Sequence, residues 1–364
     1  MKKIIHITHT DIKNDWRIRK ELKSLLDLDN VDVEGIGIDY FYDIEFPVDN
    51  IKSSNVKRFN VKNRYINLFF TFISLCLLLK VLISKKIDIL HAHDTPALFI
   101  GMLYKMLNKN TVLIYDAHEL ESNKGGQIFL FKLLTIVIEK ISFRYVDHFI
   151  TVSDSILKYY EKRFNLPQST VIYNAPNYVL SKINVESLRQ KYNIPPDSNI
   201  FVHVGLLNSG RGIEHLLEIF SSDRSNKNYL IFFGFGDLTN TIIGFQNTND
   251  NILYFGNVEN FKLHSYLIQC DYGICTISND SLSDYFSLPN KFFEYINSGL
   301  TTISSDFPEL KLATDKIDCG YYYPPSYNFL NENNKKIKYA CPEDYSWIGQ
   351  EKKLRKIYED FLQR

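Results

Sequence analysis

The sequence predicts an α/β protein built from two doubly wound domains. The chain has 364 residues, which is more than a domain with a single hydrophobic core usually contains. Its hydrophobic content of 45% is sufficient for two such cores. Near the start we expect a strand at residues 3–8, a polar loop at 9–14 and a helix at 15–26. The same order begins again with an expected strand at 199–205. Repeats of this kind are typical of parallel sheets, in which ligands bind at the carboxyl ends of the strands.

Charge and cysteine content limit the class of protein. The 42 basic and 42 acidic side chains cancel, which argues against nucleic acid as a partner because phosphate backbones attract concentrated Lys and Arg. Five scattered cysteines without a C-x-x-C pair predict neither a disulfide framework nor a structural zinc site. The stretch after Met1 is too short and polar for a signal peptide. We therefore expect a cytoplasmic protein.

The most apolar stretch runs from Asn67 to Ile83. Lys80 interrupts it, so it falls short of the roughly 20 apolar residues that span a bilayer. The preferred interpretation is a buried helix of the first domain. The alternative is a helix in the membrane interface, together with a second apolar and basic segment at 128–144, which would give peripheral contact with the cytoplasmic face of the membrane.

Polar residues end two expected strands of the first half. Residues 87–94 deliver His91 and His93, and residues 112–119 deliver Asp116 and His118. Because parallel strands end at one edge of their sheet, these side chains should line a cleft. His118 could bind a substrate oxygen or act on a proton.

Two further residues of the first half should face the same cleft. They are His9, which follows the first strand, and Arg17, which lies on the first helix. The histidines also allow a metal site, although a lone H-x-H is a weak signal.

Breaks in the pattern set the predicted domain boundaries. Asn174–Asn177 and the polar segment that follows place the first domain at 1–177 and the second at 178–344. Residues 345–364 form an amphipathic terminal helix.

The loop after the first strand of the second half is a candidate diphosphate site. Gly205 ends that strand, and Gly210 and Gly212 flank Arg211 just before a helix. Glycines let the backbone approach a ligand, while a cation and a helix N-terminus both attract anions. The loop has no P-loop or G-x-G-x-x-G pattern.

A second anion-binding stretch lies at 283–299. Pro289 is near an expected helix start, with Ser287 as the candidate N-cap. Asn290, Lys291 and Glu294 then share one helix face. Phosphate oxygens would bind the helix start and Lys291, and a carboxylate one turn later could accept bonds from sugar hydroxyls.

These features together resemble glycosyltransferase family 4 of the GT-B fold. The similarity covers essentially the whole chain, and its most specific pieces occur in order: Asp15-Trp-Arg-Ile-Arg-Lys-Glu, His91-Ala-His-Asp, Tyr115-Asp-Ala-His-Glu, Gly205-Leu-Leu-Asn-Ser-Gly-Arg-Gly and Leu288-Pro-Asn-Lys-Phe-Phe-Glu-Tyr with Ser298-Gly299. The resemblance implies two Rossmann-like domains facing across a cleft, with the acceptor on the first and a sugar nucleotide on the second. It also implies a terminal helix that returns to the first domain, and metal-independent transfer with retention.

The resemblance also implies residue roles. Glu294 matches the residue that holds the ribose hydroxyls, and Arg211 occupies the position of the family's diphosphate lysine. Asn290 and Lys291 would lie beside the diphosphate or the donor sugar, and His118 resembles the cleft histidine near the transferred sugar.

Two positions depart from the family pattern. Phe286 replaces a glutamate that contacts the donor sugar in many members, and Leu206 replaces an arginine. The first departure leaves the donor sugar undetermined, and the second leaves Arg211 and Lys291 as the main cations for the leaving diphosphate.

The sequence thus predicts a glycosyltransferase that uses a nucleoside-diphosphate sugar and no metal, in assembly of a bacterial surface polysaccharide or glycoconjugate. Its acceptor would be a glycan or a lipid-linked glycan. The alternatives are a metal-dependent hydrolase using His91, His93, Asp116 and His118, a nucleotide-binding subunit without activity, and a sugar-nucleotide epimerase.

Overall fold

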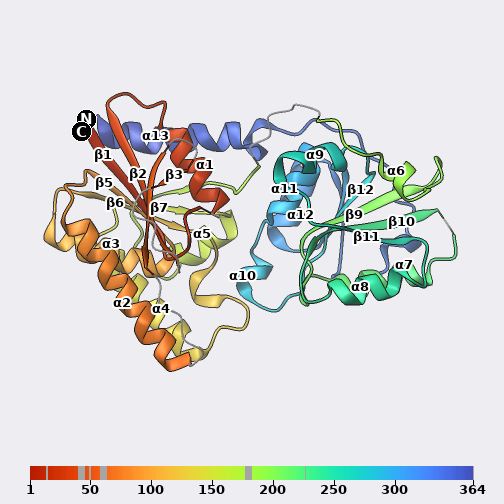
Figure 1. Ribbon diagram of the computed structural model, residues 1–364, viewed down its shortest axis with the longest axis horizontal. Coiled ribbons are helices and arrows are strands. Elements are labelled where there is room, and N and C mark those ends of the chain that lie inside the picture. The colour runs from red at the N-terminus through yellow and green to blue at the C-terminus, as the bar shows by residue number, and fades with distance from the viewer. Residues whose placement is uncertain are drawn as a thin grey trace. The chain divides into compact units, whose positions relative to one another are not determined.

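The computed structural model describes residues 1–13, 15–39, 46–48, 51–57, 64–176, 183–225 and 227–363. The chain forms two compact units (Figure 1). One comprises Met1–Tyr173 with Gln350–Arg364, and the other comprises Asn174–Gly349. The unit boundaries fall after residues 173 and 349, where the sequence indicated 177 and 344.

The first unit contains an eight-stranded sheet in the order β3-β4-β2-β1-β5-β6-β7-β8. All neighbouring strands are parallel except β3 and β4, which pair antiparallel. The strands are β1 (Lys2–Ile7), β2 (Val31–Asp39), β3 (Phe46–Val48), β4 (Ile51–Lys57), β5 (Ile89–His93), β6 (Val112–Ala117), β7 (His148–Thr151) and β8 (Gln168–Val171).

Helices cover both faces of this sheet. They are α1 (Trp16–Leu25), α2 (Arg64–Ile83), α3 (Asp94–Leu107), α4 (Phe129–Ser142), α5 (Asp154–Glu161) and α13 (Trp347–Leu362), with a 3-10 turn at Glu121–Asn123. The helices α2, α3 and α4 lie side by side (Figure 1). Residues of α1 and α13 contact side chains on the sheet face that His91 and His93 share.

The helix α1 begins as the sequence indicates. The Asp15 side chain accepts a hydrogen bond from the backbone N–H of Ile18 at 3.1 Å, which caps the helix. Its inner face buries Arg17, Glu21 and Leu22, so two charged residues lie among the apolar ones. Arg17 therefore does not lie on the solvated face that charged residues of a surface helix usually occupy.

The second unit contains a six-stranded parallel sheet in the order β11-β10-β9-β12-β13-β14. The strands are β9 (Asn199–Leu206), β10 (Asn228–Phe235), β11 (Ile252–Gly256), β12 (Tyr272–Cys275), β13 (Thr301–Ser305) and β14 (Gly320–Tyr323). The helices are α6 (Leu188–Lys191), α7 (Ile213–Ser222), α8 (Thr239–Gln246), α9 (Asn260–Leu267), α10 (Leu282–Tyr285), α11 (Asn290–Asn297) and α12 (Pro308–Ile317), with 3-10 turns at Phe329–Asn331 and Glu343–Tyr345.

In each sheet the strand order reverses at one strand, so that later strands are added on both sides of it. In the first unit β1 lies between β2 and β5, and in the second unit β9 lies between β10 and β12. Such switch points open a crevice at the carboxyl ends of the strands, where doubly wound proteins bind ligands. The predicted α/β class with two doubly wound domains is confirmed.

The apolar helices of the first unit are only partly buried. On α2, which was expected to be a buried helix of this domain, Leu78 and Leu82 are buried, whereas Phe72 and Ile83 are exposed. The helix α4 is more exposed still, with Leu130 at 69%. Over the part of the chain that the structure describes, none of the helices combines the length and hydropathy needed to cross a bilayer.

Candidate functional site

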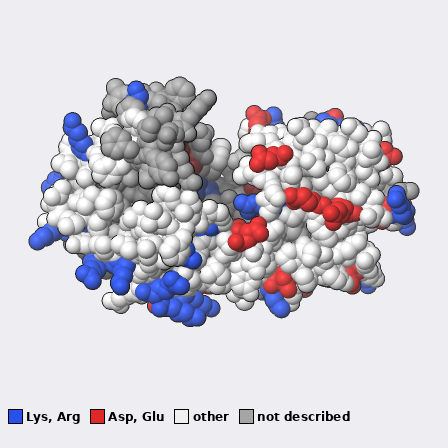
Figure 2. Space-filling model, turned by 90° about the horizontal axis from the view of Figure 1, so that it is seen from below, with Lys and Arg blue, Asp and Glu red and all other residues white. Residues whose placement is uncertain are grey.

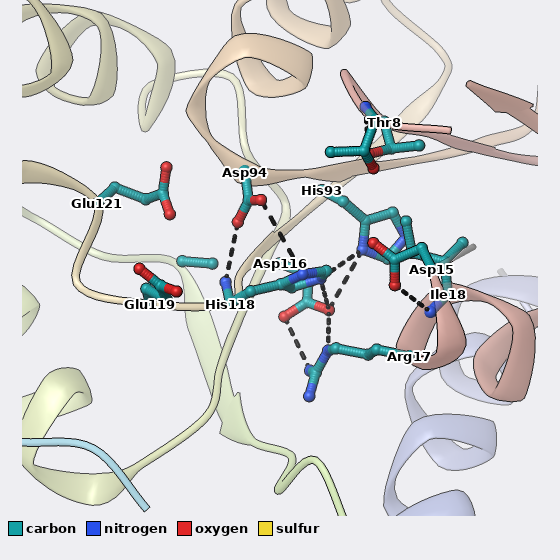
Figure 3. A network of polar contacts seen from close by, with 12 residues as sticks. Thr8, Asp15, Arg17, Ile18, His93, Asp94, Asp116, His118, Glu119 and Glu121 are labelled. Carbon is teal, nitrogen blue, oxygen red and sulfur yellow. Dashed lines mark hydrogen bonds and ion pairs between the residues drawn. The ribbon is translucent and has the colours of Figure 1, made fainter. Parts of the chain in front are cut away.

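His118 and Asp116 lie at the carboxyl end of β6, beside the switch point of the first unit. Asp116 receives two hydrogen bonds from Arg17, both of 3.0 Å, and its Oδ2 lies 3.3 Å from His118 Nε2 (Figure 3). His93 Nδ1 lies 3.0 Å from the same His118 nitrogen. Asp94 accepts a hydrogen bond from the backbone N–H of His118. Of these residues, His118 keeps 18% of its side chain exposed, whereas Arg17, His93 and Asp116 are buried.

The charges around His118 fix its protonation state. Burial alone would lower the pKa of His118, but Asp94 and Asp116 raise it to about 10. Burial alone would raise the pKa of Asp116, but Arg17 and His118 hold it well below its ordinary range. At neutral pH His118 is therefore a cation that can donate a hydrogen bond, and it lacks the free nitrogen that a general base needs.

Behind this pair lies a fully buried group of ring nitrogens and one carboxylate. Tyr358 Oη on α13 lies 2.6 Å from His91 Nδ1 and 2.8 Å from His6 Nε2. The other nitrogen of His6 lies 2.9 Å from His93 Nε2. Glu21 lies against the same histidines, and burial, followed by the charge of Asp116, raises its pKa to about 8.

In the second unit, the loop between β9 and α7 forms a tight backbone curve. Gly205, Gly210 and Gly212 all have positive φ, and Gly212 is the N-cap of α7 with φ of 74°. A Cβ atom at Gly212 would lie 2.6 Å from Thr276 Oγ1, so only glycine fits there. Arg211 between these glycines is exposed. The loop thus presents a cation and the start of a helix side by side.

Lys291 reaches the same place from α11. Its Nζ lies 3.1 Å from His203 Nε2 and donates to the carbonyl oxygen of Thr276 at 3.2 Å. Burial lowers the pKa of Lys291 to about 8, and the nearby charge of Arg211 also lowers it. Burial and Lys291 likewise hold the pKa of His203 well below its usual value. Arg211 and Lys291 both contact Thr276, whose carbonyl oxygen accepts from Lys291 and whose hydroxyl donates to the carbonyl oxygen of Arg211, so the two cations come from segments that meet at this residue.

The helix α11 begins at Asn290 with Pro289 at the N-cap position, and no described side chain caps it. The expectation that Ser287 caps it is wrong, because Ser287 Oγ donates to the carbonyl oxygen of Asp284. Asn290 is exposed, and Glu294 is half-buried one turn further along. The N-terminus of α11 thus remains available to an anion.

The structure brings the predicted residues together in two groups. His93, Asp116, His118 and Arg17 form one network in the first unit, and His9 lies half-buried in the loop after β1. In the second unit Gly205 lies near the end of β9, Arg211 and Gly212 lie in the loop before α7, and Lys291 lies on α11. Asn290 and Glu294 lie on the same helix as Lys291, which contacts Thr276 together with Arg211. Five further residues belong to these groups and were not predicted from the sequence: His6, Glu21, His203, Thr276 and Tyr358.

The two groups support different chemistry. Two neighbouring cations, glycines that admit a ligand to the backbone, and an uncapped helix suit a diphosphate. The His118 imidazolium, which lies beside the carboxylates of Asp94 and Asp116 and is partly exposed, can donate a hydrogen bond to a neutral or negative oxygen of a substrate.

Residues 42–177 match the model of the family described as Glycosyltransferase Family 4. No curated protein sequence gives a significant match to the chain. Solved structures do match it in fold. Sucrose-phosphate synthase from Thermosynechococcus elongatus is 14% identical, with a TM-score of 0.78 and 100% of both chains covered.

Several of the similar structures contain nucleotides. Anabaena HepE in complex with UDP is 12% identical, with a TM-score of 0.64, covering 99% of this chain and 90% of that one. The catalytic domain of starch synthase IV from Arabidopsis thaliana, bound to ADP and acarbose, is 12% identical, with a TM-score of 0.65 and both chains fully covered. These matches confirm the predicted GT-B fold.

Proposed function

We propose that this glycosyltransferase, which has the GT-B fold and whose residues 42–177 match family 4, transfers a sugar from a nucleoside-diphosphate sugar to an acceptor hydroxyl with retention. The observation that carries the proposal is the placement of Arg211 and Lys291, which both contact Thr276, at the switch point of the second sheet. Two cations at one sheet edge suit the diphosphate of a donor. The UDP and ADP in the Anabaena and Arabidopsis structures support a donor of this class.

In this proposal the protein's own cations offset the charge that develops on the leaving diphosphate, so no metal takes part in the reaction. Arg211 and Lys291 bind the phosphate oxygens, together with the uncapped start of α11. Gly205 and Gly212 let the diphosphate approach the backbone. Glu294 accepts hydrogen bonds from the ribose, one turn along the helix from Lys291 and Asn290.

The acceptor side of the proposal involves His118, with Asp116, Arg17, His93 and His9 around it. With its pKa near 10, His118 would donate a hydrogen bond to an oxygen of the transferred sugar or the acceptor. Asp116 and Arg17 would act as positioning residues, because they are buried and hold the imidazole in place.

The exposed face of α4 supports a lipid-linked acceptor at the membrane surface. Seven large apolar side chains between 128 and 141 are at least 42% exposed: Ile128, Phe129, Leu130, Leu133, Leu134, Val137 and Ile141. At the end of this helix Lys140, Arg144 and Arg163 line a hollow of about 450 Å³. Basic side chains gather along one edge of this unit (Figure 2). An apolar helix face beside cations is typical of proteins that bind anionic membrane surfaces, and such contact would place the enzyme at the cytoplasmic face in glycoconjugate assembly.

The hydrolase alternative is less well supported. A hydrolytic metal centre needs an open coordination position for water. His91 and His93 have no exposed surface, and Asp116 is already bound to Arg17.

Donor binding is the direct test. Nucleoside diphosphates and their sugar conjugates would be screened for stabilisation of the full chain. We expect one nucleoside diphosphate to raise the free energy of unfolding by about 2.7 kcal/mol when its concentration is 100 times its dissociation constant. Arg211→Ala and Lys291→Ala should each lower transition-state stabilisation by about 2–4 kcal/mol. The control is Lys262→Ala, which removes an exposed cation from α9. Near wild-type turnover in both test variants would refute the site, and donor binding without transfer or hydrolysis would favour a subunit without activity.

A further inference from the structure

Four side chains of the first unit surround one buried point. Glu21 comes from α1, His6 from β1, and His91 and His93 from β5. None of the four has exposed surface. Glu21 Oε2 lies 4.0 Å from His6 Nδ1 and 3.9 Å from both His91 Nε2 and His93 Nε2. Four potential ligand atoms, three nitrogens and one oxygen, therefore all lie within 4.8 Å of one another.

Two atoms that face this point, Glu21 Oε2 and His91 Nε2, are buried without a hydrogen-bond partner among the described residues. Arg17 forms an ion pair with Oε1 at 3.0 Å, which leaves Oε2 directed at the histidines. Burying polar atoms without partners is costly, so a native structure calls for an explanation of each one.

The opposite ring nitrogens all have partners. Tyr358 Oη lies 2.6 Å from His91 Nδ1 and 2.8 Å from His6 Nε2. His93 Nδ1 lies 3.4 Å from Asp116 Oδ2. Histidines that bind a metal show this pattern, with one nitrogen on the ion and the other held by a carboxylate or hydroxyl.

We propose that His6, His91, His93 and Glu21 bind one divalent transition-metal ion, with Zn²⁺ as the best match to three imidazoles and a carboxylate. Zinc sites without an open position are structural, and the full burial of these four residues fits that class. The ion would join α1, β1 and β5, and through Tyr358 it would fix α13 to the sheet. The ion takes no part in the proposed reaction, although its ligand His93 contacts His118 at 3.0 Å, and the inference does not depend on the proposed function.

The geometry requires a small adjustment on binding. Tetrahedral bonds of about 2.0–2.1 Å separate ligand atoms by roughly 3.3 Å. The 2.9 Å between His6 Nδ1 and His93 Nε2 would widen slightly, and Glu21 Oε2 would move inward by roughly half an ångström or more to meet this spacing. The competing explanation is a metal-free cluster in which His6 and His93 share a hydrogen bond and Glu21 carries a proton.

Metal content separates the two explanations. We expect the full-length protein, after gel filtration, to retain close to one equivalent of a divalent metal by mass spectrometry. Protein produced with Co²⁺ should show the visible absorption of a tetrahedral nitrogen and oxygen site. A wild-type protein that retains less than about one-tenth of an equivalent, and whose Tm is unchanged by added Zn²⁺ or Co²⁺, would overturn the proposal.

Variants locate the ion. Glu21→Gln and His91→Gln should lose the bound metal, and Tyr358→Phe should weaken binding by about 10–100-fold. The control is His148→Gln, which removes a buried histidine of the same sheet that contacts Thr170 at 2.9 Å. Circular dichroism and gel filtration verify that each variant folds. Full metal content in the Glu21→Gln/His91→Gln double variant would show that the ion lies elsewhere.

Discussion

Lys291 lies 3.1 Å from His203, and the lysine cation is the donor in that contact. The pKa of His203 is held well below its usual value by burial and by Lys291, so the imidazole is neutral and its Nε2 accepts. Because burial lowers the pKa of Lys291 to about 8, the cation is only marginally favoured at physiological pH. A bound diphosphate would place negative charge beside Lys291 and so favour its protonated form.

Donor use should therefore depend on the protonation of Lys291. Only the protonated amine attracts the diphosphate, so kcat/KM for the donor should be constant below about pH 7 and fall as pH rises through about 8. In Lys291→Arg the guanidinium stays charged, and this decline should disappear even if the overall value is lower. Lys291→Met should lose about 10²–10³-fold in kcat/KM. An unchanged decline above pH 8 in either variant would assign it to another group.

Gly212 should be needed for donor binding as well as for the fold. An alanine there would strain the backbone at φ of 74° and place Cβ 2.6 Å from Thr276 Oγ1, displacing the loop that carries Arg211. Gly299 is the matched control, since it has the same φ and a Cβ added there would meet no described atom within 4 Å. Both alanine variants should lose about 1–2 kcal/mol in urea unfolding. Only Gly212→Ala should also weaken nucleotide binding, by about tenfold or more in calorimetry, and equal affinities in the two variants would contradict this prediction.

The residues that were predicted correctly from the sequence follow from its periodicity and from the ends of its strands. Short apolar runs that end in polar residues located Asp116 and His118 at the carboxyl end of β6, and paired glycines located the loop of Arg211. These signals are local, because side chains at the end of a parallel strand always meet the same sheet edge.

The residues that were missed depend on contacts distant in sequence. His203 lies inside β9 between apolar neighbours, and its partner Lys291 is 88 residues away. Tyr358 meets His91 across 267 residues. Glu21 offered a signal in its position four residues after Arg17, but an exposed ion pair on a helix has the same spacing. Burial alone distinguishes the two, and burial follows from how α1 packs on the sheet.

Arg17 should contribute strongly to stability. Its guanidinium donates both bonds to Asp116 and is only 3% exposed, so Arg17→Met would leave a buried carboxylate without its cation. We expect a loss of about 3–5 kcal/mol in the free energy of unfolding by urea. Arg19→Met, which removes a half-buried arginine stacked on Trp16, should cost about 1 kcal/mol or less.

A double-variant cycle tests whether the Arg17 effect arises from Asp116. Because Asp116→Asn removes the charge that Arg17 neutralises, Arg17→Met should cost less in the Asp116→Asn background, with a coupling energy of about 1–3 kcal/mol. Additive losses would mean that Arg17 stabilises the fold through Glu21 or the carbonyl oxygen of Ile172 instead.

The α4 face should bind vesicles that contain anionic lipid. Leu130 and Leu134 are 69% and 51% exposed, and burying such side chains in the interface would contribute about 1.5–3 kcal/mol each. Leu130→Glu/Leu134→Glu should therefore abolish co-sedimentation. Leu312→Glu, at a 55% exposed position on α12 in the other unit, should bind like the wild type.

The basic residues beside α4 predict how salt acts on this binding. Lys140, Arg144 and Arg163 should each add about 1 kcal/mol on an anionic surface, so replacing all three by Gln should weaken binding by more than 100-fold at low salt. Raising the salt concentration should weaken the wild type far more than this triple variant, because it screens only the charges. If the wild type sediments equally well with neutral vesicles, the cations play no part, and if it fails to sediment with either kind, the α4 face binds something other than a membrane.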